Sequence, residues 1–156
     1  MYRIKQAVEK IKKDIAGKNV LEVACGTADF SVEASEFAEH VDCIDLDDFR
    51  LNSVVAKCPN ITFERMDATA LRFANGTYDT AVVYNALAHL ETVIDRVVSE
   101  CLRVVKLGGN IYFISSFSMD KYTIENKFLP HLSDIKLDYA VFNDKTFTYV
   151  QINKQQ

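Results

Sequence analysis

The feature that most constrains the fold of this chain is a regular alternation of strand-like and helix-like segments. Short apolar runs of buried-strand type occur at 19–24, 41–45, 61–65, 79–84 and 111–115. Segments with helical spacing lie between them, and the clearest of these runs from about 92 to 105. Repeated alternation of this kind predicts a parallel sheet, because right-handed crossovers place the helices on both of its faces.

The two ends of the chain complete this arrangement. Apolar residues at helical spacing between 4 and 15 predict an amphipathic helix that Gly17 ends. In the tail, 135–142 and 147–152 are typical of two strands around a short polar turn, which favours an antiparallel hairpin at the sheet edge. We therefore expect an α/β fold, a three-layer αβα sandwich around a mostly parallel seven-stranded sheet, built as a single domain over 1–156.

The charge of the chain argues against a nucleic-acid partner. The formal net charge is −4, whereas phosphate contacts need clustered lysine and arginine. Six of the 18 basic residues do lie within the first 18 positions. We interpret this cluster as the solvated face of the first helix rather than as a patch for an acidic partner.

The cysteines, the first residues and the apolar runs of the chain indicate the cellular compartment that we expect for it. Four cysteines stand alone at 25, 43, 58 and 101, with no C-x-x-C pair and no histidine at zinc-ligand spacing, so no metal site is expected. No signal-peptide pattern opens the chain, and no apolar run approaches the roughly 18 residues of a membrane span. We expect a cytoplasmic protein with reduced thiols and no membrane partner.

The carboxyl edge of the predicted sheet is where an open parallel sheet binds its ligands. The first strand leads into a turn of small residues, Ala24, Cys25, Gly26 and Thr27, which lets a ligand approach the backbone closely. Glu22 is unusual inside this apolar strand, because a buried carboxylate needs a partner. An ammonium group of a ligand would supply that partner, directly or through water; the alternative is a glutamate capped by the backbone or by an arginine.

Acidic residues also follow the next two strands. Asp45 ends the second strand, 23 positions after Glu22, where an acid can accept hydrogen bonds from both ribose hydroxyls; the alternative is a helix cap. Asp67, with Ala68, follows the third strand and could accept from the exocyclic amine of a purine; the alternative is a surface turn.

In these segments the chain resembles the class I S-adenosyl-methionine-dependent methyltransferases. The stretch 20–28 is similar to the first motif of that family, Asp45 to its ribose-binding acid, and 66–68 to its adenine-contact motif. Further similarity covers 78–90, around the fourth strand, and 102–109, which resembles a conserved R-V-L-K-P-G-G run with Leu107 in place of the proline. The resemblance implies a Rossmann-like fold, S-adenosyl-methionine as cofactor and S-adenosyl-homocysteine as product. It implies cofactor contacts from Glu22, Ala24, Cys25, Gly26, Thr27, Asp45, Leu46, Asp67, Ala68, Asn85 and Ala86.

The chain departs from the family in the glycine-rich turn. Only Gly26 remains of the three glycines that often occur there, with Ala24 and Ala28 at the outer positions. An alanine in a left-handed conformation costs roughly 1 kcal/mol, so we expect reduced cofactor affinity at most. Asp29 stands where a dinucleotide-binding turn has its third glycine and would repel a pyrophosphate, which argues against a nicotinamide-dependent oxidoreductase.

The chemistry implied by the resemblance asks little of the protein beyond orientation of the acceptor, since the sulfonium already activates the methyl group. Tyr84 and His89 follow or end the fourth strand and are the candidate catalytic residues. His89 is a general base in one interpretation and a structural or cofactor-contacting residue in the other.

The class of methyl acceptor is limited mainly by motifs and segments that the sequence does not contain. We favour a small molecule. Asn85 is followed by Ala86-Leu87 and not by Pro-Pro-Tyr or Pro-Pro-Phe, which argues against methylation of amide or exocyclic base nitrogens, and no dedicated set of metal-binding carboxylates is visible, which argues against a metal-dependent catechol-type reaction. No large insertion follows the fifth strand, where many relatives carry a substrate lid. The acceptor pocket is then either open or completed by another chain, such as a second copy in a homodimer. A degenerate cofactor-binding subunit that supports a partner protein is the alternative function.

Overall fold

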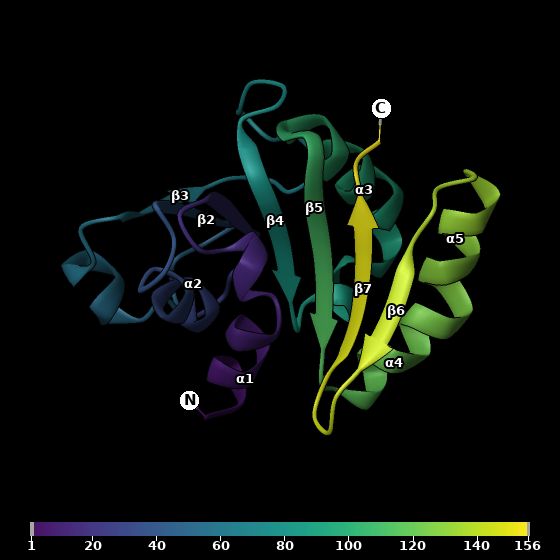
Figure 1. The fold of residues 1–156 in the computed structure, drawn as a ribbon, viewed down its shortest axis with the longest axis horizontal. Coiled ribbons are helices and arrows are strands. Elements are labelled where there is room, and N and C mark those ends of the chain that lie inside the picture. The colour runs from purple at the N-terminus through teal and green to yellow at the C-terminus, as the bar shows by residue number, and fades with distance from the viewer. Residues whose placement is uncertain (1, 156) are drawn as a thin grey trace.

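The computed structural model describes residues 2–155, which form a seven-stranded sheet flanked by helices (Figure 1). The strands are β1 (Asn19–Val23), β2 (His40–Asp45), β3 (Ile61–Arg65), β4 (Tyr78–Tyr84), β5 (Val105–Ser115), β6 (Ala140–Asn143) and β7 (Thr148–Asn153). Their order across the sheet is β3-β2-β1-β4-β5-β7-β6. The predicted α/β architecture is confirmed; that 1–156 forms a single domain remains a prediction.

Strand direction explains how the C-terminal hairpin fits into a parallel sheet. β1 pairs in parallel with both β2 and β4, and β4 pairs in parallel with β5. β7 lies between β5 and β6 and is antiparallel to both. The hairpin is therefore inserted with its second strand innermost, and the strand order reverses between β1 and β4, where ligands of open α/β sheets bind.

Two apolar layers cover the faces of the sheet, and Figure 1 shows α1 and α3 on opposite sides of the central strands. One layer contains α1 (Tyr2–Lys10), α2 (Asp29–Ala34) and two 3₁₀ helices, η1 (Lys12–Asp14) and η2 (Ser53–Lys57). The other contains the 3₁₀ helix η3 (Leu87–Val93), α3 (Ile94–Val104), α4 (Ser118–Thr123), the π-helix η4 (Ile124–Phe128) and α5 (Leu129–Asp134). This gives the expected three layers, because strand side chains alternate between the two faces.

Several element boundaries differ from the sequence prediction. β5 begins at Val105, immediately after α3, so the pair Gly108-Gly109 lies inside the strand rather than before it. After β2, Asn52 caps η2: its side chain accepts a hydrogen bond from Val54 N at 2.9 Å. Tertiary contacts decide such ends, since helix termini are only weakly encoded locally.

The region between β5 and β6 contains a helical stretch from 118 to 134 that the sequence pattern does not predict. Its buried side chains Ile124, Phe128 and Leu132 belong to the same apolar cluster as α3. This stretch is therefore a packed part of the sandwich and not a detached lid.

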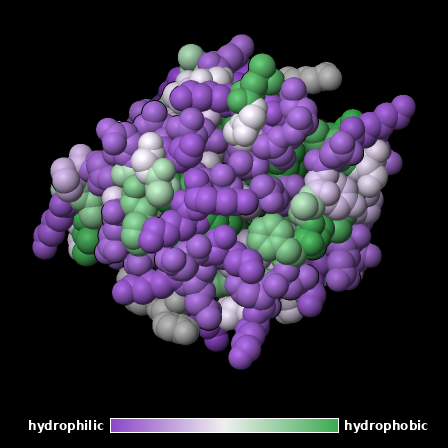
Figure 2. Space-filling model, viewed as in Figure 1, coloured by the Kyte–Doolittle hydropathy of each residue, from purple (hydrophilic) through white to green (hydrophobic). Residues whose placement is uncertain are grey.

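The surface seen in Figure 2 is largely hydrophilic, with small separate hydrophobic patches. Across residues 2–155 the structure has no helix both long enough and apolar enough to span a bilayer.

Candidate cofactor and active site

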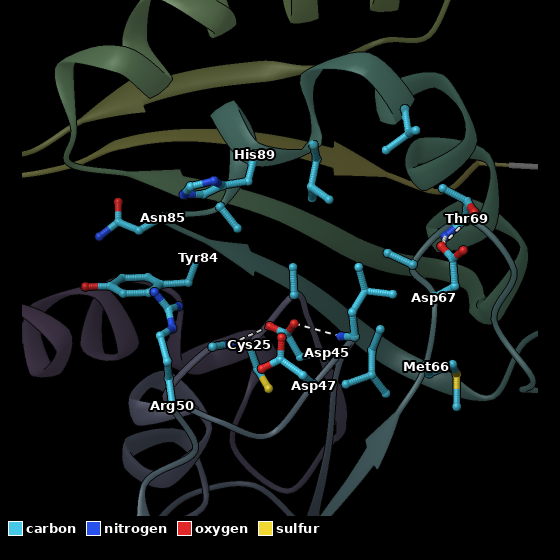
Figure 3. A pocket seen from close by; sticks show the side chains of 18 of the residues that line it. Cys25, Asp45, Asp47, Arg50, Met66, Asp67, Thr69, Tyr84, Asn85 and His89 are labelled. Carbon is cyan, nitrogen blue, oxygen red and sulfur yellow. Dashed lines mark hydrogen bonds between the residues drawn. The ribbon is translucent and has the colours of Figure 1, made fainter.

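A cavity of about 880 Å³ opens at the carboxyl ends of β1, β2 and β4, at the strand-order reversal (Figure 3). Its size falls in the range of small-molecule sites. It is lined by every residue predicted for the site except Glu22: Ala24, Cys25, Gly26, Thr27, Asp45, Leu46, Asp67, Ala68, Tyr84, Asn85, Ala86 and His89. Segments far apart in the sequence thus meet at the edge where they were expected.

Asp45 joins two of these segments. Its carboxylate accepts hydrogen bonds from Gly26 N at 2.8 Å and from Leu46 N at 2.7 Å. The backbone is tied as well, because Cys25 N donates to Ile44 O at 2.9 Å. Each carboxylate oxygen has room for a further donor. The acid is therefore held rigidly at the end of β2 and can still accept hydrogen bonds from a ligand.

The turn after β1 holds a strained backbone. Ala24 and Ala28 both have positive φ, at 56° and 62°, as does Gly26 at 55°. The left-handed conformation costs a non-glycine residue roughly 1–2 kcal/mol, and such strain clusters at functional sites. The alanines thus adopt the backbone conformation that glycine adopts most readily, so the missing glycines do not alter the shape of the turn.

Glu22 does not reach the cavity, which corrects the expectation that it pairs directly with a ligand. It is only 1% exposed and points into the layer of α2, where its carboxyl group accepts from Ser31 N at 3.1 Å and Ser31 Oγ at 2.7 Å. Burial raises the pKa of Glu22 well above its usual value. The alternative considered from the sequence, a glutamate capped by the chain's own donors, is what the structure contains.

The small thiol of Cys25 is a packing group. It is 7% exposed, and its hydrogen bond with Cys43, together with burial, raises its pKa. A thiol that stays protonated is a poor nucleophile.

Asp67 lies at the opposite end of the cavity from Tyr84 (Figure 3). Its carboxylate accepts from Thr69 Oγ1 at 2.7 Å and Thr69 N at 2.8 Å, and these hydrogen bonds lower its pKa. The side chain is therefore ionised at neutral pH. Ala68 beside it is buried and also lines the cavity.

Asn85 holds the segment after β4 in place. It has a positive φ of 51°, and its side-chain oxygen accepts from Ser116 N at 2.7 Å. Asparagine tolerates this conformation better than most residues. The residue thus links the ends of β4 and β5 and directs the following residues, Ala86 and His89, along the cavity.

The two catalytic candidates differ in character. Tyr84 is half-buried between the rings of Phe30 and Phe147, and desolvation raises the pKa of its hydroxyl to about 12. It stays protonated at neutral pH, so it can donate a hydrogen bond but cannot act as a base. His89 is exposed on η3 and lines the cavity, where its imidazole can accept a proton.

The structure adds lining residues that the sequence did not single out, among them Phe49, Arg50, Arg96 and Phe117. Arg50 lies against the β1 turn so closely that a Cβ at Gly26 would collide with its guanidinium. The position of Arg50 five residues after Asp45 was the one available signal, since loops at this edge carry ligand contacts. Within the described residues no cluster of three or more potential metal ligands occurs.

These features define a nucleoside-sized site at the switch point of a Rossmann-like sheet. A family model described as "Methyltransferase domain" matches residues 20–109. The chain belongs to this family, the class I S-adenosyl-methionine-dependent methyltransferases.

Known proteins agree with this assignment. A curated relative from Leptospira interrogans, named demethylmenaquinone methyltransferase, is 27% identical over 137 residues, which cover 81% of this chain and 53% of the relative. The chain thus spans about half the length of that relative. Among solved structures, a Methanococcus maripaludis protein aligns with a TM-score of 0.80 and 16% identity, over 98% of this chain and 85% of that one. A SAM-dependent methyltransferase from Aquifex aeolicus aligns with a TM-score of 0.76 and 16% identity, over 97% and 96%.

Proposed function

We propose that this protein transfers the methyl group of S-adenosyl-methionine to a small-molecule acceptor, with S-adenosyl-homocysteine as product. The observation that carries the proposal is the cavity itself, which places Asp67 at one end, Asp45 near the middle, and Tyr84, Asn85 and His89 at the other end. An adenosyl group matches the stretch between Asp67 and Asp45 in chemistry, because its exocyclic amine and ribose hydroxyls are donors.

The binding roles follow from the hydrogen bonds already present. Asp45, fixed by Gly26 N and Leu46 N, would accept from the ribose hydroxyls. Asp67 and Ala68 would lie along the adenine. The amino-acid portion of the cofactor would lie next to the β1 turn, from Ala24 to Thr27. Glu22 accepts a hydrogen bond from Ser31 N behind this turn, and we assign it no direct contact with the cofactor.

The cofactor supplies an electrophilic methyl group when bound, and the chain's own residues orient the acceptor and handle its proton. We assign proton removal to His89, whose imidazole lines the cavity and can act as a general base. Tyr84, protonated at neutral pH, would donate a hydrogen bond that positions the acceptor.

The mouth of the cavity indicates an acceptor with apolar surface. Phe117 follows Ser116, whose N–H donates to the side chain of Asn85, and it lines the cavity while 58% exposed. An exposed apolar side chain at a cavity can contact an apolar part of a ligand. The relatives named demethylmenaquinone methyltransferases agree with this character, so a reduced demethylmenaquinone is the first acceptor to test.

The alternative, a degenerate subunit that binds the cofactor for a partner, rests on the missing glycines and the missing lid. The first of these arguments is weakened, because Ala24 and Ala28 adopt left-handed backbone in place of the glycines. A homodimer or partner chain that completes the pocket, and a cytoplasmic location, remain predictions.

The test is methyl transfer from methyl-labelled S-adenosyl-methionine. The protein is incubated with reduced demethylmenaquinone, with a lipid extract and with an aqueous metabolite extract, and product is followed by radiolabel and mass spectrometry. We expect label in a small molecule with the wild type and none with heat-treated protein. Calorimetry with S-adenosyl-homocysteine and with NAD provides the independent binding test; binding of NAD alone would overturn the proposal.

A further inference from the structure

Arg50 stands out among the residues of the cavity because neither the sequence motifs nor the proposed roles account for it. It lines the cavity, and its guanidinium lies against Gly26 in the β1 turn. Figure 3 draws Arg50 at the end of the cavity that holds Tyr84, Asn85 and His89, away from Asp67. A cation is therefore placed at the end opposite the adenine-side acid.

The loop that carries Arg50 is tied to the same turn. Two residues later, Asn52 N donates to Thr27 O at 2.9 Å, and Asn52 Nδ2 donates to Asp29 Oδ1 at 3.0 Å. Leu51 N also donates to Asp48 O at 3.1 Å, which closes the loop on itself. These bonds fix the backbone on the C-terminal side of Arg50 next to the segment 26–29, so the guanidinium projects from a held position.

Among the residues that the structure describes, no acidic side chain pairs with Arg50. Arg50 takes part in none of the ion pairs formed among residues 2–155. The nearby acids are engaged with other groups: Asp45 with Gly26 N and Leu46 N, and Asp47 with Phe49 N at 3.1 Å. Glu22, which could have opposed it, is buried against Ser31.

We propose that Arg50 binds the α-carboxylate of the cofactor's amino-acid portion. This inference rests on the proposed function and goes further, because it names the anion and the residue that recognises it. The guanidinium matches a carboxylate with two parallel N–H donors, whereas the Tyr84 hydroxyl offers a single donor and the Asn85 amide is already bonded to Ser116. Arg50 is then a specificity residue that separates the full cofactor from nucleosides without the carboxylate.

The experiment compares two ligands on two proteins by calorimetry. The ligands are S-adenosyl-homocysteine and its decarboxylated analogue, which keeps the adenosine, the thioether and the amine. The proteins are the wild type and Arg50→Ala. A residue-by-ligand cycle of this kind isolates the interaction between the side chain and the carboxylate.

For S-adenosyl-homocysteine we expect Arg50→Ala to weaken binding about tenfold to a hundredfold, as for a hydrogen bond to a charged group. For the decarboxylated analogue we expect the two proteins to bind within about twofold of each other, since no carboxylate is present to lose. Arg50→Lys should recover part of the loss, because it keeps the charge without the paired donors.

Arg72→Ala is the matched control. Arg72 is an exposed arginine that pairs with Glu64 outside the cavity, and its loss should leave both affinities unchanged. Thermal unfolding of each variant confirms that the fold is intact.

The outcomes separate the two proposals. If the wild type binds S-adenosyl-homocysteine but Arg50→Ala binds it equally well, or loses the same factor for both ligands, the role of Arg50 is overturned and the proposed function stands. If the wild type binds neither ligand, both proposals fall.

Discussion

The two ends of the cavity are built in different ways. At the part that we propose binds the adenosyl group, called the adenosyl end below, Asp45 is locked by two backbone amides at 2.7 and 2.8 Å, and the adjoining turn holds alanines in left-handed conformation. At the other end, His89 and Phe117 project from exposed segments that follow β4 and β5. One end is shaped by backbone, and the other by exposed side chains.

This difference matches two tasks. A cofactor that is the same in every turnover is best held by preorganised backbone, which lowers the entropy cost of binding. An acceptor is chosen by side chains, which can be replaced without disturbing the sheet. Variants at the acceptor end should therefore change the rate of methyl transfer, and variants at the adenosyl end should change cofactor affinity and stability.

The largest effect is expected at His89. His89→Gln should lower kcat by about 10²–10⁴-fold for an acceptor that must lose a proton, while S-adenosyl-homocysteine affinity stays within about threefold. Steady-state kinetics and calorimetry measure the two quantities. His131→Gln, in α5 outside the cavity, is the control. An unchanged kcat would show that His89 does not take the proton.

At the adenosyl end, Asp45→Ala should weaken S-adenosyl-homocysteine binding by about 1.5–3 kcal/mol, as expected for a charged acceptor. It also leaves Gly26 N and Leu46 N without their acceptor. Calorimetry gives the affinity. Asp48→Ala removes a nearby exposed carboxylate that pairs with Arg65, and should change the affinity by less than about 0.5 kcal/mol. Equal effects of the two variants would remove Asp45 from the site.

The buried Glu22, which lies behind the β1 turn, can be tested through the pH dependence of the free energy of unfolding. The pKa of Glu22 lies well above 4.5 in the folded state because the side chain is buried. Above pH 4.5 the unfolded chain therefore ionises first, and stability falls as the pH rises toward the folded pKa. Glu22→Gln should remove this loss, gaining about 1.4 kcal/mol for each unit between the two pKa values.

Urea unfolding of wild type and Glu22→Gln between pH 4.5 and pH 8 measures this difference. The exposed Glu36→Gln serves as the control and should follow the wild-type curve. A difference between Glu22→Gln and wild type that does not grow with pH would contradict the burial of an ionisable group at this position.

The smallest effect concerns the strained turn. Ala24→Gly should raise the free energy of unfolding by up to about 1 kcal/mol, since relief of left-handed strain exceeds the added chain entropy of glycine. Ala56→Gly, at an exposed helical position without positive φ, should lower it by about 0.5–1 kcal/mol. Opposite signs in thermal or urea unfolding support the strain at Ala24; a loss in both would argue against it.

Much of the architecture could be predicted from local pattern. β3 has the bounds expected from the alternation at 61–65, and the seven strands and three layers follow the periodicity of the chain. The stretch 118–134 could not be predicted, because its three short helical pieces show too little periodicity to separate them from a loop. For the site, segment positions were predictable, whereas the direction of each side chain was not.

The sequence by itself determined the order of strands and helices and the family motifs, because these depend on neighbours within a few residues. It also placed Asp45 and Asp67 at strand ends, from which the edge that binds ligand follows. Only the tertiary structure decided that Glu22 turns away to Ser31 and that Arg50 reaches the β1 turn. Both outcomes depend on contacts between segments that are distant in the chain. Burying a charged group costs free energy unless folding places hydrogen-bond partners beside it, and the local sequence does not encode those partners.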